Sequence, residues 1–109
     1  MAKSKVVVFE KANEPLEVQE FDIPELKESC VLVKTTLSGV CGTDPHCWRG
    51  QVKEMPVPVI LGHESVGQID KIASDRKTDS VGEPVKEGDT IFWVAGHPCG
   101  QCHACVIEK

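Results

Sequence analysis

Residues that could bind a metal ion and transfer a proton are grouped at two places in this chain. The first group runs Cys41-Gly42-Thr43-Asp44-Pro45-His46, and Gly62-His63-Glu64 follows downstream. A catalytic zinc site needs three protein ligands and one open position, and thiolate and imidazole both suit zinc. This pattern predicts part of a catalytic zinc site, with Cys41 and His63 as two of its ligands.

The second group is a run of cysteines near residue 100. Cys99, Cys102 and Cys105 are each separated by two residues, and cysteine pairs at such spacing wrap a tetrahedral structural zinc. A closed site of this kind needs a fourth ligand. His103 lies inside the run, but its neighbours Cys102 and Cys105 restrict its reach, so we do not expect it to be that ligand.

Two other types of cysteine site use similar spacing. A bacterial iron–sulfur run would place its next cysteine four residues after Cys105, where this chain has Lys109. A thioredoxin-like reading of Cys99 and Cys102 requires a βαβ unit, and no segment here has that pattern. A zinc-binding lobe is therefore favoured over both.

The elements that position these groups are short. We expect strands over residues 6–9, 16–20, 30–37, 65–72 and 89–94, and one or two helical turns over 44–49. Asp44 is the expected N-cap, Pro45 suits the first helical position and Gly50 would end the helix. With nine glycines and seven prolines, the pattern predicts a mainly β domain, either a partly open barrel or a sandwich. Cys41 and His63 would then lie at strand ends.

Length and charge restrict the class of protein. A chain of 109 residues makes one domain, residues 1–109, and its net charge of −5 argues against binding to nucleic acid or to an anionic membrane surface. No apolar run is long enough for a membrane span or a signal peptide. We therefore expect a cytoplasmic protein, in which six cysteines are better explained as metal ligands or buried thiols than as disulfides.

No G-x-G-x-x-G motif occurs, so a nucleotide-binding Rossmann domain is not encoded here.

Taken together, the motifs resemble those of the zinc-dependent medium-chain alcohol dehydrogenases. Cys41, Thr43, Asp44 and His46 match one family pattern, and Gly62, His63, Glu64 and Gly67 match the second. The resemblance implies that Cys41 and His63 bind the catalytic zinc and that Glu64 lies behind it, able to exchange onto it. It further implies that Thr43 and His46 form a proton relay and that Asp44 accepts the spare ring N–H of His63.

The resemblance also implies the fold and the reaction. The chain corresponds to the N-terminal part of a GroES-like, partly open β-barrel with a cysteine-rich zinc lobe, cut before either zinc site is complete. Zinc would polarise the oxygen of an alcohol while hydride passes to NAD or NADP, giving an aldehyde or ketone. The third catalytic ligand, the fourth structural ligand and the cofactor-binding domain would lie beyond Lys109. We therefore expect the isolated chain to be inactive.

Several alternatives remain open from the sequence. The chain could be a non-enzymatic zinc-binding or interaction module, although Thr43 and His46 would have no purpose in a purely structural metal site. Cys30 is expected in a strand, ordinary packing is expected for Cys47, and Trp48 could either line a substrate pocket or pack the domain. The substrate, the choice between NAD and NADP, and the oligomeric state, including a homo-oligomer, are not determined.

Overall fold

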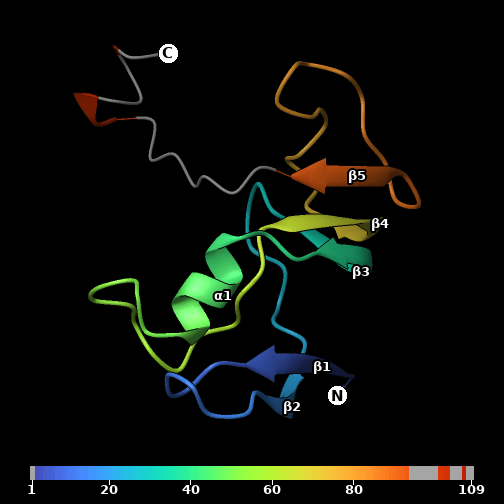
Figure 1. Ribbon diagram of the computed structural model, residues 1–109. Helices are drawn as coiled ribbons and strands as arrows, with labels where there is room; N and C mark the ends of the chain where they lie inside the picture. The colour runs from blue at the N-terminus through green and yellow to red at the C-terminus, as the bar shows by residue number, and fades with distance from the viewer. Residues whose placement is uncertain (1, 94–100, 104–106, 108–109) are drawn as a thin grey trace.

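The structure is a computed structural model that describes residues 2–93, 101–103 and 107. Its elements in chain order are β1 (Lys3–Val8), β2 (Glu17–Asp22), β3 (Val31–Gly39), α1 (Thr43–Trp48), β4 (Glu64–Ile72) and β5 (Thr90–Trp93). Figure 1 shows β1 and β2 as one hairpin, β3, β4 and β5 as a separate sheet, and α1 beside both. The expected strands are all present, with ends that differ by up to three residues.

The N-terminal hairpin is a two-stranded antiparallel sheet in which Lys3 lies opposite Asp22 and Val8 lies opposite Glu17. The run of valines from Val6 to Val8 suits a strand because β-branched side chains pack well on a pleated surface. Val8 is buried, whereas Val7 and Val18, which lie opposite each other, are both exposed. One face of the hairpin therefore exposes the Val7–Val18 pair beside the charged pair of Lys5 and Glu20.

The second sheet has the order β3-β4-β5, with both pairs antiparallel. The β3–β4 pairing contains two register shifts, between Leu32 and Val33 and between Thr35 and Leu37. Such shifts bend a strand and increase its twist. After the second shift the pairing ends with Gly39 opposite Glu64, so the last residue of β3 meets the first residue of β4. This register brings the chain after β3 close to the chain before β4.

The N-terminal hairpin is tied to the segment between α1 and β4. Phe9, just after β1, exchanges two backbone hydrogen bonds with Val59, of 2.8 and 3.0 Å. Val8, Phe9, Cys47 and Ile69 are the buried apolar residues of the described part of the chain. Cys47 therefore packs as an ordinary core residue, as expected. Cys30 is exposed and immediately precedes β3 rather than lying within it.

These features confirm the expected fold class. The described part of the chain is mainly β with one short helix, and the two sheets do not close on each other, as in a partly open barrel. No helix within these residues is long and apolar enough to cross a membrane.

Cys99 and Cys105 of the expected zinc lobe lie outside the described residues, and Cys102, which is described, is exposed.

The expected helix start was wrong in detail. The N-cap of α1 is Gly42, which has no side chain to cap the helix, and Pro45 is the third helical residue rather than the first. The carboxylate of Asp44 accepts the backbone N–H of Cys41 instead, at 3.0 Å. The expected helix end was right, because Gly50 follows the C-cap residue Arg49 with a positive φ of 73°.

Candidate metal centre

The candidate metal ligands meet where β3 ends and β4 begins. Cys41 lies in the turn between β3 and α1, His63 immediately precedes β4, and Glu64 is the first residue of β4. The pairing of Gly39 with Glu64 fixes how these two turns approach each other. A motif after one strand and a motif before the next are thus brought to one end of the sheet.

The ligand atoms of Cys41, His63 and Glu64 all lie within 4.8 Å of one another. Donor atoms around a tetrahedral zinc ion lie about 3.5 Å apart, given bond lengths of roughly 2.0–2.3 Å. Small side-chain movements would therefore close this trio on a metal ion. Thiolate, imidazole and carboxylate are also the three ligand types that zinc uses in proteins, so the residues present fit this metal.

Asp44 contacts both candidate ligands from the helix side. One carboxylate oxygen, Oδ2, accepts the backbone N–H of Cys41, and the other, Oδ1, lies 4.0 Å from Nδ1 of His63. The second distance is within ion-pair reach but longer than a hydrogen bond. The Asp44 side chain is only 17% exposed, so little water competes for it. If His63 uses Nε2 for the metal, the Asp44 carboxylate is placed on the side of the ring where Nδ1–H would donate a hydrogen bond.

The surroundings of Cys41 favour the ionised form of its thiol by lowering its pKa. Hydrogen bonds from the backbone and then the side chain of Thr43, followed by one from His63, hold the pKa of Cys41 below its ordinary value. The thiolate rather than the thiol is the form that binds metal. Local hydrogen bonding therefore favours the ligand form of Cys41.

Thr43 and His46 lie on the same helix, and Thr43 is next to the ligand trio. Thr43 Oγ1 is 3.7 Å from Cys41 Sγ, so its hydroxyl borders the place where a metal ion would lie. His46 is one turn further along α1, and residues three apart on a helix share a face. Nδ1 of His46 makes a hydrogen bond with Oε1 of Gln51. The spacing of the motif did not indicate this partner, because it depends on how the chain turns after α1.

Gly39 gives Glu64 the space that it occupies. A Cβ atom built on Gly39 would lie 2.8 Å from Glu64 Oε2 and 3.3 Å from Glu64 Cβ, closer than side chains normally approach. Any larger residue at this position would push the Glu64 carboxylate aside. The sequence shows a glycine that could end a strand, but it does not show which residue lies opposite.

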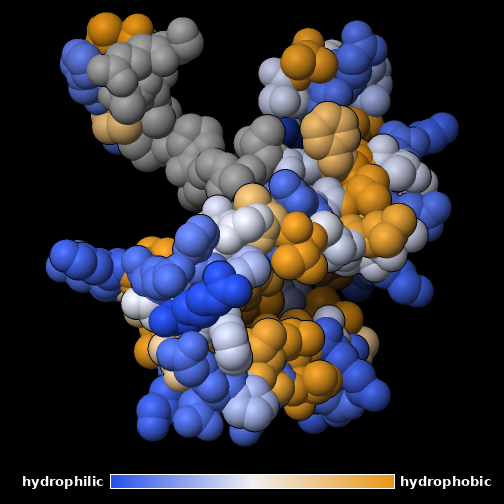
Figure 2. Space-filling model, viewed as in Figure 1, coloured by the Kyte–Doolittle hydropathy of each residue, from blue (hydrophilic) through white to orange (hydrophobic). Residues whose placement is uncertain are grey.

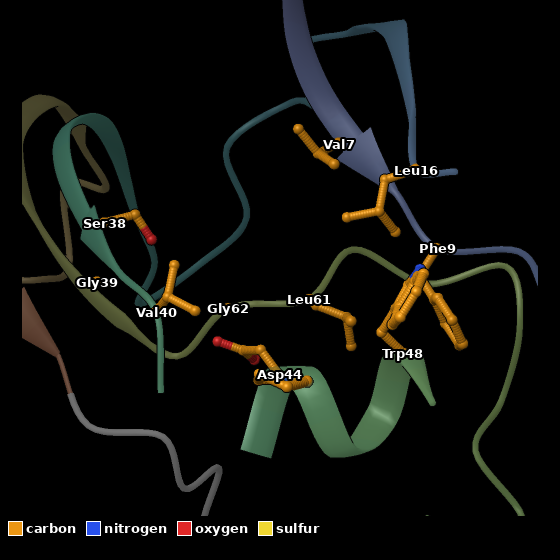
Figure 3. Close-up of a pocket in the computed structure, with 11 residues that line it drawn as sticks. Val7, Phe9, Leu16, Ser38, Gly39, Val40, Asp44, Trp48, Leu61 and Gly62 are labelled. Carbon is orange, nitrogen blue, oxygen red and sulfur yellow. The ribbon is translucent and has the colours of Figure 1, made fainter. Parts of the chain in front are cut away.

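An apolar pocket of about 460 Å³ lies between the hairpin and α1. In Figure 3, Val7 and Leu16 of the hairpin region, Trp48 of α1, and Val40 and Leu61 project toward the same space. The Trp48 indole also donates a 2.8 Å hydrogen bond to the carbonyl oxygen of Glu14. Trp48 therefore serves both of the roles considered for it: it lines a pocket and it packs the domain.

A second pocket, of about 610 Å³, is lined by two of the three candidate ligands. His63 and Glu64 lie on its polar side, and Leu37, Val66 and Phe92 form a row across β3, β4 and β5 on its apolar side. Phe92 is 80% exposed. Figure 2 shows apolar surface gathered over the hairpin and again near β5. The candidate metal site thus opens onto uncovered apolar surface.

Comparison with known proteins agrees with this fold. Residues 27–109 match the model of the alcohol dehydrogenase GroES-like domain. A curated relative, 5-exo-hydroxycamphor dehydrogenase of Pseudomonas putida, is 40% identical over 106 residues, which cover 97% of this chain and 28% of that protein.

Solved structures agree as well. The crystal structure of an alcohol dehydrogenase from Thermotoga maritima matches with a TM-score of 0.87 and 38% identity, over 99% of this chain and 29% of that one. An alcohol dehydrogenase from Escherichia coli CFT073, solved with NADH, matches with a TM-score of 0.77 and 32% identity, over 98% and 29% of the two chains.

This chain belongs to the family of the alcohol dehydrogenase GroES-like domain. The resemblance inferred from the two sequence motifs is therefore confirmed, and so is the GroES-like fold. The chain spans less than a third of the length of the relatives that it matches.

Proposed function

We propose that this chain provides the catalytic metal site of a zinc-dependent dehydrogenase that interconverts small alcohols with aldehydes or ketones. The observation that carries the proposal is the convergence of the Cys41, His63 and Glu64 ligand atoms within 4.8 Å, with the Thr43 hydroxyl beside the thiol. The relatives' names support the reaction class, since they are dehydrogenases. Their greater length supports a further domain for cofactor binding.

Each residue at the site has a task in this proposal. Cys41 and His63 hold the metal, Glu64 is available to it, and Asp44 orients His63. A bound zinc ion supplies Lewis acidity toward the substrate oxygen, and NAD or NADP supplies the hydride acceptor. The Thr43 hydroxyl accepts the proton of the substrate alcohol, and His46 passes a proton on toward solvent, since one ring nitrogen of a neutral imidazole accepts a proton while the other can donate one.

A second, structural zinc is part of the proposal. Cys99, Cys102 and Cys105 would hold it, with a fourth ligand from outside this chain. We also place the protein in the cytoplasm. Cys30, Cys41 and Cys47 are all thiols in this structure, and thiols persist where the compartment is reducing.

The experiment uses the full-length protein that contains this sequence, and not residues 1–109 alone. Alcohol-dependent reduction of NAD and of NADP is measured over a panel of primary and secondary alcohols, for wild type, His63→Ala and Cys30→Ala. We expect His63→Ala to lose activity by several orders of magnitude and Cys30→Ala to keep it, because the exposed Cys30 lies outside the site. Full activity in His63→Ala would overturn the proposal.

The chain of residues 1–109 tested alone separates the enzyme from its rival, a zinc-binding module. We expect this chain to bind zinc weakly and to reduce neither NAD nor NADP, because no dinucleotide-binding motif is present in it. Hydride transfer by the purified 109-residue chain would contradict this expectation. Tight zinc binding by a full protein that oxidises none of the alcohols would favour the non-enzymatic module.

A further inference from the structure

The C-terminal end of α1 closes in a Schellman motif that ends at Gln51. The N–H of Gly50 donates to the carbonyl of Cys47 at 3.0 Å. The N–H of Gln51 donates to the carbonyl of His46, also at 3.0 Å. These two hydrogen bonds define the motif. They turn the chain back onto the last turn of the helix, so Gln51 lies beside His46 although five positions separate them.

This reversal depends on the glycine. Gly50 has a φ of 73°, in the left-handed region that side chains disfavour. A Cβ atom at this position would also lie 3.0 Å from the Cβ atom of Ala12, in the loop after β1. Both the backbone conformation and the nearby hairpin loop therefore favour glycine at this position, where the chain turns back toward the helix.

The side chains at the two ends of the motif form a polar contact. This motif commonly brings together an apolar pair at these positions, but here Oε1 of Gln51 meets Nδ1 of His46. An amide oxygen can only accept a hydrogen bond, so with Oε1 facing the ring this contact is a hydrogen bond when Nδ1 carries the proton. In the neutral ring Nε2 then keeps its lone pair, and this second nitrogen is available to accept a proton.

We propose that Gln51 is a positioning residue that fixes His46 as the Nδ1–H tautomer and presents Nε2 as the proton acceptor. The use of that acceptor, to take the proton arriving from Thr43, rests on the proposed function. The tautomer itself rests only on the contact between Gln51 and His46. Without this partner the ring would favour the Nε2–H tautomer that imidazoles adopt in water, and its acceptor nitrogen would point the wrong way.

The tautomer can be read directly by NMR. The protein is labelled with 15N-histidine, and long-range 1H–15N correlations are recorded at about pH 8.5, where an ordinary imidazole is neutral. Loss of one signal set in His46→Gln assigns the His46 ring. We expect the pattern of a proton on Nδ1 and an unprotonated Nε2.

Two substitutions test the role of Gln51. Gln51→Leu removes the acceptor, and we expect the ratio of the Nδ1–H to the Nε2–H tautomer of His46 to fall about fivefold, the effect of one ordinary hydrogen bond. Gln51→Glu keeps an acceptor oxygen and should restore the wild-type pattern, which a general loss of packing would not do. Gln68→Leu, at an exposed position on β4, is the matched control and should leave His46 unchanged.

Three results would overturn the inference: a wild-type His46 with its proton on Nε2, an unchanged ratio in Gln51→Leu, or no restoration in Gln51→Glu. Because Gln51 is exposed, none of these substitutions should unfold the chain. The measurement involves no turnover. A dehydrogenase assay that shows no activity would therefore contradict the proposed function and leave the tautomer assignment unaffected. An active enzyme whose His46 carries its proton on Nε2 would contradict only the role of Gln51.

Discussion

Asp44 is the residue of α1 that lies against two of the candidate metal ligands, Cys41 and His63. One carboxylate oxygen accepts a hydrogen bond from the backbone N–H of Cys41, and the other lies 4.0 Å from Nδ1 of His63. A carboxylate of this kind fixes the orientation and tautomer of a ligating histidine. This use explains why Asp44 is not the N-cap of α1, although its type and place in the sequence suggested that role.

We expect Asp44→Asn to weaken zinc binding by about 10- to 100-fold, the usual cost of losing such a partner. The amide is close in size to the carboxylate but carries no charge toward His63. Zinc affinity is measured by competition with a chromophoric chelator. Asp70→Asn, on the exposed part of β4, is the control, and equal affinities of the two variants would contradict this role of Asp44.

The space at Gly39 gives a second prediction at this scale. Gly39→Ala should displace the Glu64 carboxylate and lower metal affinity by about tenfold, comparable to the loss of a supporting group. Gly42→Ala adds the same methyl group where no atom lies within 4 Å, and should bind metal as wild type does. The same chelator competition measures both variants. A Gly39→Ala protein with wild-type metal affinity would show that metal binding does not depend on the present position of the Glu64 carboxylate.

Much of the site was predictable at the residue scale because its members are close in sequence. Cys41, Thr43, Asp44 and His46 lie within six positions, and His63 and Glu64 are adjacent. The contacts of Gly39 with Glu64 and of Gln51 with His46 were not predictable in this way. The first depends on the strand register after a bulge, and the second on a helix cap. The sequence indicated that Gly50 ends the helix. It did not indicate that the turn at Gly50 places Gln51 beside His46.

At the scale of elements, α1 is held to the N-terminal hairpin through its last residue. The Trp48 indole donates to the Glu14 carbonyl, and the Trp48 carbonyl accepts the N–H of Asn13 at 2.8 Å. Trp48→Phe keeps the ring but removes the first of these bonds. We expect it to lower the free energy of unfolding by about 1 kcal/mol, measured by urea denaturation. Trp93→Phe is the control, and an equal loss there would argue against a specific contact.

The loop after β4 is tied to the loop before β3 by Asp75. Its carboxylate accepts hydrogen bonds from the hydroxyl and the backbone N–H of Ser29. These bonds, the hydroxyl first, hold the pKa of Asp75 below its ordinary value. A depressed folded-state pKa means that the stabilisation is present above the unfolded-state pKa, about 3.9, and is lost as the pH falls through the folded-state value.

We therefore expect Asp75→Asn to be less stable than wild type at pH 7 and to approach wild type as the pH falls below about 4. Urea denaturation at several pH values measures the difference. Ser29→Ala, which removes only the hydroxyl, should show a smaller difference with the same trend. A difference that stays constant from pH 7 to pH 3 would contradict this account of the two loops.

Strand positions were predicted well because β-branched runs and the glycine and proline positions mark them. The strand ends were less accurate: β3 continues through Gly39, although the sequence favoured an end near Leu37. Pairing with β4 extends the strand, since every second residue exchanges a further pair of ladder hydrogen bonds with its partner. This is information about a neighbour that the local sequence does not contain.

At the scale of the whole molecule, this chain is more open than a compact domain. Its Cα radius of gyration is 16.0 Å, against about 13 Å expected for a compact domain of this length. Figure 2 shows apolar areas on the surface. Val18 and Phe92 are among the exposed large apolar residues. Uncovered apolar patches of this kind promote association.

We expect the 109-residue chain by itself to associate in solution, and Phe92→Ser to reduce that association. Sedimentation velocity over a range of concentrations measures it. Val81→Ser changes a side chain that is just as exposed, at 81% against 80%, but that lies in the loop between β4 and β5 instead of on the sheet. If the two variants sediment alike, the sheet face is not the associating surface.

The central claim is that Cys41, His63 and Glu64 form one metal site. Cobalt(II) titration tests it most directly, because a thiolate bound to cobalt gives a charge-transfer absorption band. The protein is first prepared with Cys99, Cys102 and Cys105 replaced by serine, which removes the second cysteine group. We predict a band that saturates at one equivalent of cobalt, disappears in Cys41→Ser and persists in Cys30→Ser. A band that survives Cys41→Ser, or no band in the parent protein, would contradict the site.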